Sequence, residues 1–420
     1  MVGVQVGPAS SQVLNLEDSL AELELLAETA GIEVLATLTQ NLEAINSRTF
    51  IGSGKVEELK LLAEELDVGV ILFDEELTPR HQRELEEVLG KSVKIIDRSA
   101  LILDIFSQHA RTREGMLQVE LAQLEYRLPR LTRAWTHLAR QAGGAAGRTG
   151  STGGVGLRGP GETQLEVDRR EIKTRIVRLK EELEKVREHR LRHREHRRKT
   201  NVPVVALVGY TNAGKSTLLN TLTNADIYVA DKLFATLDST SRQLKLSTGY
   251  PVVLSDTVGF ISKLPHHLIA SFKATLMEVQ DADLLLHIVD VSDERFEYYI
   301  QQVNTVLQQI GADSIPQIII FNKIDKVDSM FPAVVKRRYP EAILISAVNG
   351  TNIDKLIAKI EEVLLGNKNL KLKIPYDKTS LVSKLHDIAE ILNEDYKEDG
   401  IYLEVGISKD DIYLVENYVI

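Results

Sequence analysis

The chain has 420 residues, no cysteine, a formal net charge of −10 and a hydrophobic content of 43%. The lack of cysteine excludes disulfides and zinc–thiolate sites and favours a reducing cytoplasm. No apolar run approaches the roughly 20 residues that span a bilayer, and the first 14 residues lack the pattern of a secretory signal. We therefore expect a cytoplasmic protein of several domains, a monomer without a membrane span.

Charge is unevenly distributed along the chain. Residues 111–200 contain 22 lysines and arginines against 12 acidic residues, and the rest contains 29 against 49. Eighteen of those 22 cations are arginines, whose planar guanidinium suits phosphate better than an ammonium group does. The net negative charge of the whole chain argues against nucleic-acid binding. The positively charged middle of the chain is therefore the candidate region for such binding.

The first 111 residues alternate between helix and strand patterns and form the first predicted domain. Such alternation predicts a small doubly wound parallel α/β sheet. The patterns predict helices over 16–30, 55–66, 79–89 and 100–109, and strands over 32–38, 68–73 and 93–96.

A short glycine loop at residues 52–55 partly matches a phosphate-binding loop. Thr49 stands where the first glycine is needed, and Val56 follows the lysine. We prefer a glycine turn that begins a helix. An anion at that helix N-terminus, an RNA phosphate or a nucleotide assisted by Arg48 and Lys55, remains an alternative.

Residues 112–200 form the second predicted domain, an antiparallel helical hairpin. Two leucine and isoleucine stripes with 4-3-4-3 spacing predict two helices that pack against each other. The stripes are Leu117, Leu121, Leu124, Leu128 and Leu131, and then Ile172, Ile176, Leu179, Leu183 and Val186. The first helix should reach Arg140, a length of about 40 Å, with a kink at Pro129.

The tip of this hairpin, residues 141–161, holds nine of the 26 glycines. A flexible linker is one reading; a cationic loop that contacts RNA is the other. The second helix ends in a charged run over 187–199, either a solvated helix end or a phosphate-binding stripe. The candidate RNA contacts are Arg140, Arg148, Arg158, Arg187, Arg190, Arg194, Arg197, Arg198 and Lys199.

A phosphate-binding loop lies at residues 209–217, with the pattern G-x-x-x-x-G-K-S between a buried strand and a helix. Lys215 would reach the β- and γ-phosphates, and Ser216 would coordinate Mg²⁺. The predicted contacts are Gly209, Tyr210, Thr211, Asn212, Ala213, Gly214, Lys215, Ser216 and Thr217.

The next motif follows a predicted strand over 251–256. Asp256 would hold Mg²⁺ directly or through water, and Gly259, after Thr257 and Val258, would contact the γ-phosphate through its N–H. A first switch is predicted around Phe234, Ala235, Thr236 and Leu237. Thr236 is the predicted third Mg²⁺ ligand beside Ser216 and Asp256, with Thr240 as the alternative.

Two further motifs indicate guanine. A predicted strand over 316–321 leads into Asn322, Lys323, Ile324 and Asp325, the pattern N-K-x-D. The Asp325 carboxylate can accept two guanine N–H groups that adenine does not offer. Asn322 would brace the loops, Lys323 would cover the base, and a strand over 342–345 would bring the Ser346 and Ala347 backbone to the guanine carbonyl. We therefore expect GTP and GDP as ligands of a P-loop GTPase domain over 201–366.

Phe260 follows Gly259, where many GTPases carry a water-orienting glutamine. No residue of the chain is therefore assigned as the catalytic group, and we expect slow hydrolysis that is completed by something else. The candidates are a partner, a backbone group of the switch, or K⁺ near Asn212. His266 and His267 are alternatives as general bases, although surface switch residues are the simpler reading.

Residues 367–420 form a fourth predicted domain, small, acidic and of α/β type. The patterns predict strands over 370–374, 401–405 and 412–415, and a helix over 380–392. They indicate no chemistry for this domain.

The chain resembles the HflX family of the Obg–HflX group. Residues 158–166 read R-G-P-G-E-T-Q-L-E before a long helix, and residues 233–238 read L-F-A-T-L-D, two patterns of that family. Ser239 stands where the family usually has proline. The resemblance implies a GTPase that binds the 50S ribosomal subunit and its rRNA, is stimulated by it, and splits stalled or idle 70S ribosomes under stress. It also implies that the N-terminal domain and the hairpin tip approach the peptidyl-transferase region.

Two alternatives remain at this point. One is an RNA-remodelling or ribosome-assembly factor with an ATP site at residues 52–55. The other is a GTP-regulated switch for protein interactions that has no role with RNA.

Overall fold

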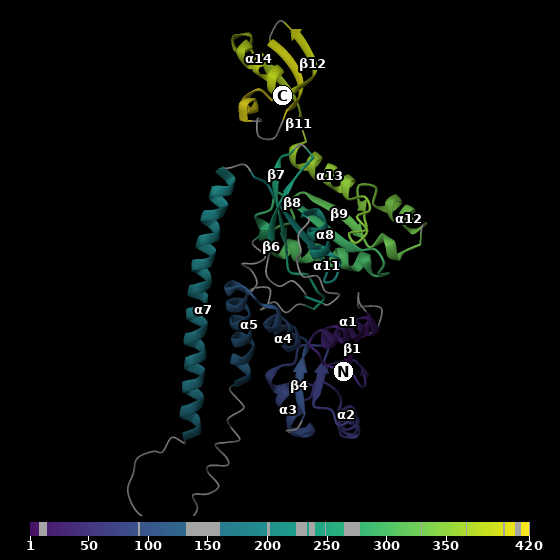
Figure 1. Cartoon of the computed structure of the whole chain (residues 1–420). Coiled ribbons are helices and arrows are strands. Elements are labelled where there is room, and N and C mark those ends of the chain that lie inside the picture. Colours follow the sequence, from purple (N-terminus) through teal and green to yellow (C-terminus); the bar gives the residue numbers. More distant parts are fainter. Residues whose placement is uncertain are drawn as a thin grey trace, which may run out of the picture.

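The computed structural model describes residues 1–7, 15–90, 93–131, 160–199, 202–223, 233–234, 240–247, 249–263, 278–328, 330–366, 368–397, 400–407 and 413–419. Along these residues the chain forms an N-terminal sheet, a pair of long helices, a second and larger sheet, and a small C-terminal sheet (Figure 1). No helix among them is both long and apolar enough to cross a membrane.

The N-terminal sheet is parallel and has the strand order β2-β1-β3-β4. The α1 and α4 helices pack on one face of it, and α2 and α3 pack on the other. This arrangement confirms the doubly wound fold. The strands are β1 (Val2–Val6), β2 (Leu38–Leu42), β3 (Val70–Phe73) and β4 (Lys94–Asp97), and the helices are α1 (Leu16–Thr29), α2 (Ser53–Glu65), α3 (Pro79–Leu89) and α4 (Arg98–His109).

One predicted strand of this sheet was placed wrongly, and one strand was missed. The strand expected over 32–38 begins only at Leu38, because β2 pairs in register with β1 from Val2↔Leu38 onward. The apolar residues Ile32 and Val34 instead pack against the core beneath α1 and α4. The strand β1 was not predicted, because the helix and strand patterns on which the prediction rests begin only at residue 16.

The two long helices are α5 (Arg113–Leu131) and α7 (Pro160–Lys199). They lie side by side and antiparallel in Figure 1, with Leu117, Leu121, Ile176 and Leu179 forming the buried seam between them. Ion pairs from Arg113 to Glu182 and from Glu120 to Arg175 flank this seam. With 40 residues, α7 is about 60 Å long and continues well past the paired segment. The predicted extension of α5 to residue 140 lies outside the described residues.

The larger sheet has the order β10-β9-β8-β5-β7-β6, and only β6 is antiparallel to its neighbour. The helices α8 and α13 cover one face, and α11 covers the other. Its elements are β5 (Val204–Gly209), α8 (Lys215–Thr223), β6 (Thr240–Lys245), β7 (Pro251–Asp256), β8 (Leu284–Asp290), α11 (Phe296–Gln309), β9 (Gln317–Asn322), α12 (Phe331–Arg338), β10 (Ile343–Leu344) and α13 (Ile353–Leu365).

The C-terminal sheet has three antiparallel strands in the order β11-β13-β12, and α14 packs on it. Its elements are β11 (Lys368–Ile374), α14 (Thr379–Ile388), β12 (Glu390–Lys397) and β13 (Gly400–Ile407). The helix predicted to residue 392 ends at Ile388, because the next residues pair with β13. The predicted strand over 412–415 is also wrong, since Tyr413 and Leu414 lie in a 3-10 turn.

Candidate nucleotide-binding site

The predicted phosphate loop joins β5 to α8 at the carboxyl edge of the larger sheet. Two of its glycines have backbone conformations that other residues rarely adopt. The φ of Gly209 is +155° and that of Gly214 is +94°. A Cβ on Gly209 would lie 2.3 Å from the Ile288 carbonyl oxygen, and one on Gly214 would lie 2.2 Å from Asn322 Nδ2. The loop therefore requires glycine at both positions in order to approach β8 and β9.

Lys215 lies beneath this loop with 7% of its surface exposed. Its Nζ donates hydrogen bonds to the carbonyl oxygens of Gly209 and Tyr210, at 3.2 and 2.9 Å. Burial lowers the pKa of Lys215 to about 8, and the nearby Asp256 carboxylate only partly opposes this shift. Lys215 is thus a cation whose charge is easily lost above neutral pH.

The first residues of α8 and the last residue of β7 bring two predicted Mg²⁺ ligands together. Ser216 Oγ donates a hydrogen bond of 2.6 Å to Asp256 Oδ2, and Asp256 is fully buried. Thr240, the alternative to Thr236, is paired in register with Asp256. Thr236 itself lies outside the described residues.

This donor set fits Mg²⁺, which takes oxygen ligands and is held by one or two carboxylates together with waters and substrate phosphates. No cluster of three or more acidic, histidine or cysteine ligands exists among the described residues. A magnesium ion at Ser216 and Asp256 would therefore depend on the nucleotide for part of its coordination.

The segment after Asp256 lies directly on the phosphate loop. The Phe260 N–H donates to the Gly209 carbonyl at 3.1 Å, and the Thr211 N–H donates to the Phe260 carbonyl at 2.8 Å. Thr257 Oγ1 donates to the Leu207 carbonyl at 2.6 Å. Val258 and Gly259, which lie between Thr257 and Phe260, are buried. Residues 257–263, which we call the second switch, are thus held against the phosphate loop by backbone and side-chain hydrogen bonds.

The first switch is described only in part. Phe234 is buried, and its ring packs edge-on against Phe106 of α4, with 4.7 Å between ring centroids. Ala235, Thr236 and Leu237 lie outside the described residues, as do His266 and His267.

The two guanine motifs meet at the ends of β9 and β10. Asn322 Nδ2 donates to the Ala213 carbonyl at 2.9 Å, and the Ala347 N–H donates to Asn322 Oδ1 at 3.0 Å. Asn322 therefore connects the phosphate loop with the last motif. Ser346 Oγ donates to the exposed Asp325 carboxylate. Lys323 has a left-handed backbone, with φ of +66°.

The remaining predicted contacts also lie at this edge of the sheet. Lys323 Nζ forms an ion pair with Asp290 at 2.6 Å, and Ile324 begins a short 3-10 helix that contains Asp325. Asn212 is exposed with φ of +61°, and Thr217 lies in the first turn of α8. The structure thus brings the phosphate-loop, Asp256 and guanine motifs to one edge.

The candidate RNA contacts are only partly described. Arg140, Arg148 and Arg158 lie outside the described residues. Arg187 lies on the exposed part of α7 and is ion-paired with Glu184 at 3.4 Å. Arg190, Arg194, Arg197, Arg198 and Lys199 belong to the same helix, and their side chains are outside the description.

The glycine loop at residues 52–55 begins α2, with Gly52 as the N-cap. Arg48 forms an ion pair with Glu84 at 2.7 Å, and Lys55 forms one with Glu58 at 2.8 Å. Both cations proposed to assist an anion there have carboxylate partners, which favours the structural reading of this turn.

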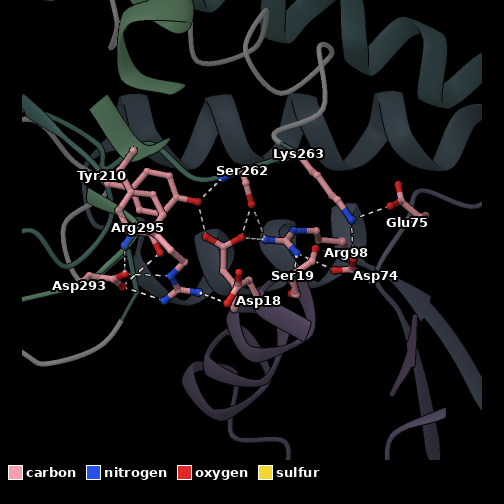
Figure 2. A network of polar contacts seen from close by, with 12 residues as sticks. Asp18, Ser19, Asp74, Glu75, Arg98, Tyr210, Ser262, Lys263, Asp293 and Arg295 are labelled. Carbon is pink, nitrogen blue, oxygen red and sulfur yellow. Dashed lines mark hydrogen bonds and ion pairs between the residues drawn. The ribbon is translucent and has the colours of Figure 1, made fainter. Parts of the chain in front are cut away.

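Sequence reasoning missed a buried polar cluster where the N-terminal sheet meets the phosphate loop (Figure 2). The Glu22 carboxylate accepts hydrogen bonds from Arg98, Tyr210 and Ser262. Tyr210 also stacks on Tyr299, with ring centroids 4.1 Å apart. Tyr210 lies in the predicted phosphate loop, but Glu22, Arg98 and Ser262 belong to no predicted motif and are far apart in sequence, so no local pattern reveals the cluster.

Comparison with known proteins agrees with this geometry. Residues 17–107 match a family model described as GTP-binding GTPase N-terminal, and residues 109–197 match one described as GTP-binding GTPase Middle Region. Residues 204–323 match a model described as 50S ribosome-binding GTPase.

Curated relatives cover nearly the whole chain. The GTPase HflX of Caldanaerobacter subterraneus is 47% identical over 405 residues, 96% of this chain and 91% of the relative. The GTPase HflX of Escherichia coli is 44% identical over 393 residues, 93% of this chain and 89% of the relative. A solved structure of a GTP-binding protein from Sulfolobus solfataricus with GDP is 24% identical, with a TM-score of 0.43, and the match covers 86% of this chain and 98% of the other.

The phosphate loop, the Asp256 motif and the guanine motifs lie together on a P-loop fold, and the curated relatives that match almost the whole chain are named as GTPases. The chain therefore belongs to the HflX family and is an enzyme that binds and hydrolyses GTP.

Proposed function

We propose that this GTPase binds the large ribosomal subunit, that the ribosome accelerates its GTP hydrolysis, and that it separates stalled or idle 70S ribosomes under stress. The observation that carries the proposal is the match of residues 204–323 to a model described as 50S ribosome-binding GTPase. Family membership over nearly the whole chain supports it.

Phe260 supports the dependence on a partner. Its side chain is 5% exposed and packs with Val208, Val279 and Leu285 beneath α11. A phenyl ring in this core cannot orient a water molecule by hydrogen bonding. The group that completes hydrolysis would then come from outside this position, and a bound ribosome is the natural source.

Ser216, Asp256 and Thr236 would hold Mg²⁺, which when bound neutralises charge on the phosphates. Lys215 and the N–H groups of the loop would orient the phosphates, and Asp325 would select guanine.

A potassium ion near Asn212 would add further positive charge beside the phosphates. Replacing potassium by sodium at constant ionic strength would then slow turnover, whereas equal rates would contradict the potassium site.

The arginine-rich end of α7 supports RNA as part of the partner. Arg187 and the cations that follow it lie on a helix that extends past its α5 partner. Each phosphate contact releases counterions, so binding through this helix should weaken steeply as salt concentration rises.

The decisive experiment measures GTP turnover by the purified protein alone, with 50S particles and with 70S particles, and follows 70S separation by sedimentation. We expect stimulation by 50S particles and GTP-dependent loss of the 70S peak. Equal turnover with and without particles would contradict the proposal.

A second experiment tests the RNA contact. Replacing Arg190, Arg194, Arg197 and Arg198 by glutamine should weaken 50S binding and flatten its salt dependence. Basal GTP turnover without ribosomes serves as the control for folding. Unchanged ribosome affinity in this variant would instead favour a protein-interaction switch.

A further inference from the structure

We propose that Glu22 and Arg98, both from the N-terminal part of the chain, are positioning residues for the nucleotide site. They hold the second switch against the phosphate loop in an arrangement that disfavours a third phosphate. They thereby set the relative affinities of the protein for GDP and GTP. The inference concerns the established GTPase activity and does not depend on the ribosome.

Arg98 is the centre of the cluster. It is the first residue of α4, and it is 2% exposed. Its Nη1 donates to Asp74 Oδ1 at 2.7 Å. Its Nη2 donates to the Glu22 carboxylate and to Ser262 Oγ, the latter at 3.2 Å. One guanidinium therefore connects two carboxylates of the N-terminal part with a residue of the second switch (Figure 2).

The Glu22 carboxylate is hydrogen-bonded to both the phosphate loop and the second switch. Its carboxylate accepts from the Tyr210 hydroxyl and from Ser262 Oγ. The Ser262 N–H in turn donates to the Tyr210 hydroxyl at 2.6 Å. Burial, and next the Glu22 charge, raise the pKa of Tyr210 well above its ordinary value, so the phenol remains a donor to Glu22. The phosphate loop and the switch thus share one anionic acceptor.

Lys263 provides a second tie beside the first. Its Nζ donates to Asp74 Oδ2 at 2.5 Å and to Glu75 Oε1 at 2.6 Å. Burial alone would raise the pKa of Asp74, but the charges of Arg98 and Lys263 outweigh it and bring the pKa below its ordinary value. Asp74 is therefore an anion at neutral pH, and it holds the switch from the N-terminal sheet.

The switch is held in a place where space is limited. A Cβ on Gly259 would lie 2.9 Å from Lys215 Nζ and 2.9 Å from Thr211 Cα. A γ-phosphate contacts both the loop lysine and the switch glycine N–H in P-loop GTPases. Because Gly259 packs this closely against Lys215 and Thr211, we infer that a γ-phosphate entering between the lysine and the switch would displace residues 259–263. That shift would move Ser262 and Lys263 away from buried partners, whose charges would lose hydrogen bonds.

The test measures dissociation constants of the full-length protein for GDP and for a non-hydrolysable GTP analogue. Ser262→Ala removes the hydrogen bonds that Oγ donates to Glu22 and accepts from Arg98. Lys263→Met removes the two ion pairs of Nζ, to Asp74 and Glu75. We expect each to favour the GTP analogue over GDP by about threefold to tenfold, the range of one ordinary hydrogen bond. A purely structural role would change both constants by the same factor.

The matched control is Arg295→Gln. Arg295 also forms an ion pair across the same interface, with Asp18 at 3.2 Å, but it precedes α11 rather than belonging to the switch. We expect its ratio of GDP to GTP-analogue affinity to equal that of the unmodified protein. An equal change of the ratio in this variant would overturn the proposal.

Glu22→Gln tests the shared acceptor in the N-terminal part, since it keeps the shape of the side chain and removes its charge. We expect the same direction as for Ser262→Ala, with circular dichroism to establish that the variant is folded. If it does not fold, the two switch variants decide alone. An unchanged ratio in both, or a shift toward GDP, would overturn the inference.

Discussion

Burial sets the charge state of two side chains beneath the phosphate loop. The pKa of Lys215 is lowered to about 8 by burial. His287 on β8 is 1% exposed, and its pKa is lowered to about 3 by burial and then by the Lys215 charge. Its Nδ1 meets Gln317 Nε2 at 2.5 Å, as expected of a neutral ring that accepts a hydrogen bond. Each residue gives the protein a distinct dependence on pH.

Nucleotide binding should take up a proton above pH 8. The free protein loses the Lys215 proton as pH rises through about 8, whereas bound phosphates hold the charged form. Affinity for GDP should therefore fall between pH 7.5 and 9, by at most about tenfold per pH unit. Calorimetry in buffers of different ionisation enthalpy measures the uptake directly, and Lys215→Arg should abolish it. Binding without proton uptake at pH 8.5 would contradict this charge state.

His287 should make the protein less stable in acid. Its folded pKa of about 3 lies below the ordinary value of 6.5, so between these values the unfolded chain binds more protons. Stability is fully present above about pH 6.5 and falls below it by up to about 1.4 kcal/mol per pH unit. His287→Gln should flatten the slope of the unfolding free energy between pH 4 and 6.5, measured by urea denaturation. An identical slope would exclude His287 as its source.

Asp325 should determine which base is bound. It is exposed, and its carboxylate accepts from Ser346 Oγ, so the group is held in place yet open to a ligand. Asp325→Asn replaces an acceptor by a donor, which should weaken GTP binding by at least about 100-fold and favour xanthosine triphosphate. Competition binding with the two nucleotides measures this preference. Unaltered GTP selectivity would remove Asp325 from the guanine site.

At the scale of elements, the nucleotide site depends on how closely the loops approach the strands. The phosphate loop touches β8 at Gly209 and β9 through Gly214, and Asn322 connects that loop to the segment after β10. Three motifs far apart in sequence are thus held by contacts among strand ends. The order of the motifs was predictable, but these contacts required the sheet.

Gly214→Ala should damage the site through its backbone. The φ of +94° is strained for alanine, and the new methyl would lie 2.2 Å from Asn322 Nδ2. We expect a loss of about 1–3 kcal/mol in stability and a larger loss of nucleotide affinity. Gly249→Ala is the matched control, since it has φ of +83° but no atom within 4 Å of the added carbon. Equal nucleotide affinity in the two variants would contradict a role for the contact with Asn322.

At the scale of the whole molecule, the N-terminal sheet and the GTPase sheet share one apolar cluster. Phe106 and Leu103 of α4 belong to the same buried group as Tyr210, Phe234 and Ile261. The polar cluster around Arg98 lies beside it. A substitution in the core of one part should therefore alter the packing of the other.

Phe106→Ala and Phe73→Ala separate this coupling from stability. Both side chains are buried, but Phe73 lies in the core formed by β1, β3, α2 and α3, whereas Phe106 packs on Phe234. Each substitution should lower stability by about 3–5 kcal/mol. Only Phe106→Ala should also change the GDP dissociation rate, which a fluorescent nucleotide reports. Equal dissociation rates in both variants would show that the two parts are uncoupled.

The sequence alone was sufficient for features with local or periodic signals. The phosphate loop, Asp256 and the N-K-x-D motif follow strands in an order that predicts a GTPase, and the 4-3-4-3 stripes predict the packed pair α5 and α7. The strand Val2–Val6 and the end of α14 at Ile388 depend on strand pairing, and sequence reasoning placed neither.

Tertiary structure alone decided what lies against the nucleotide site. Glu22, Arg98 and Ser262 are separated by 76 and 164 residues along the chain, so no periodicity or motif connects them. Their association depends on the docking of one sheet against another. Charged side chains buried at this interface are stable only when they are paired. Glu22 and Arg98 therefore pair with each other and with residues of the phosphate loop and the second switch.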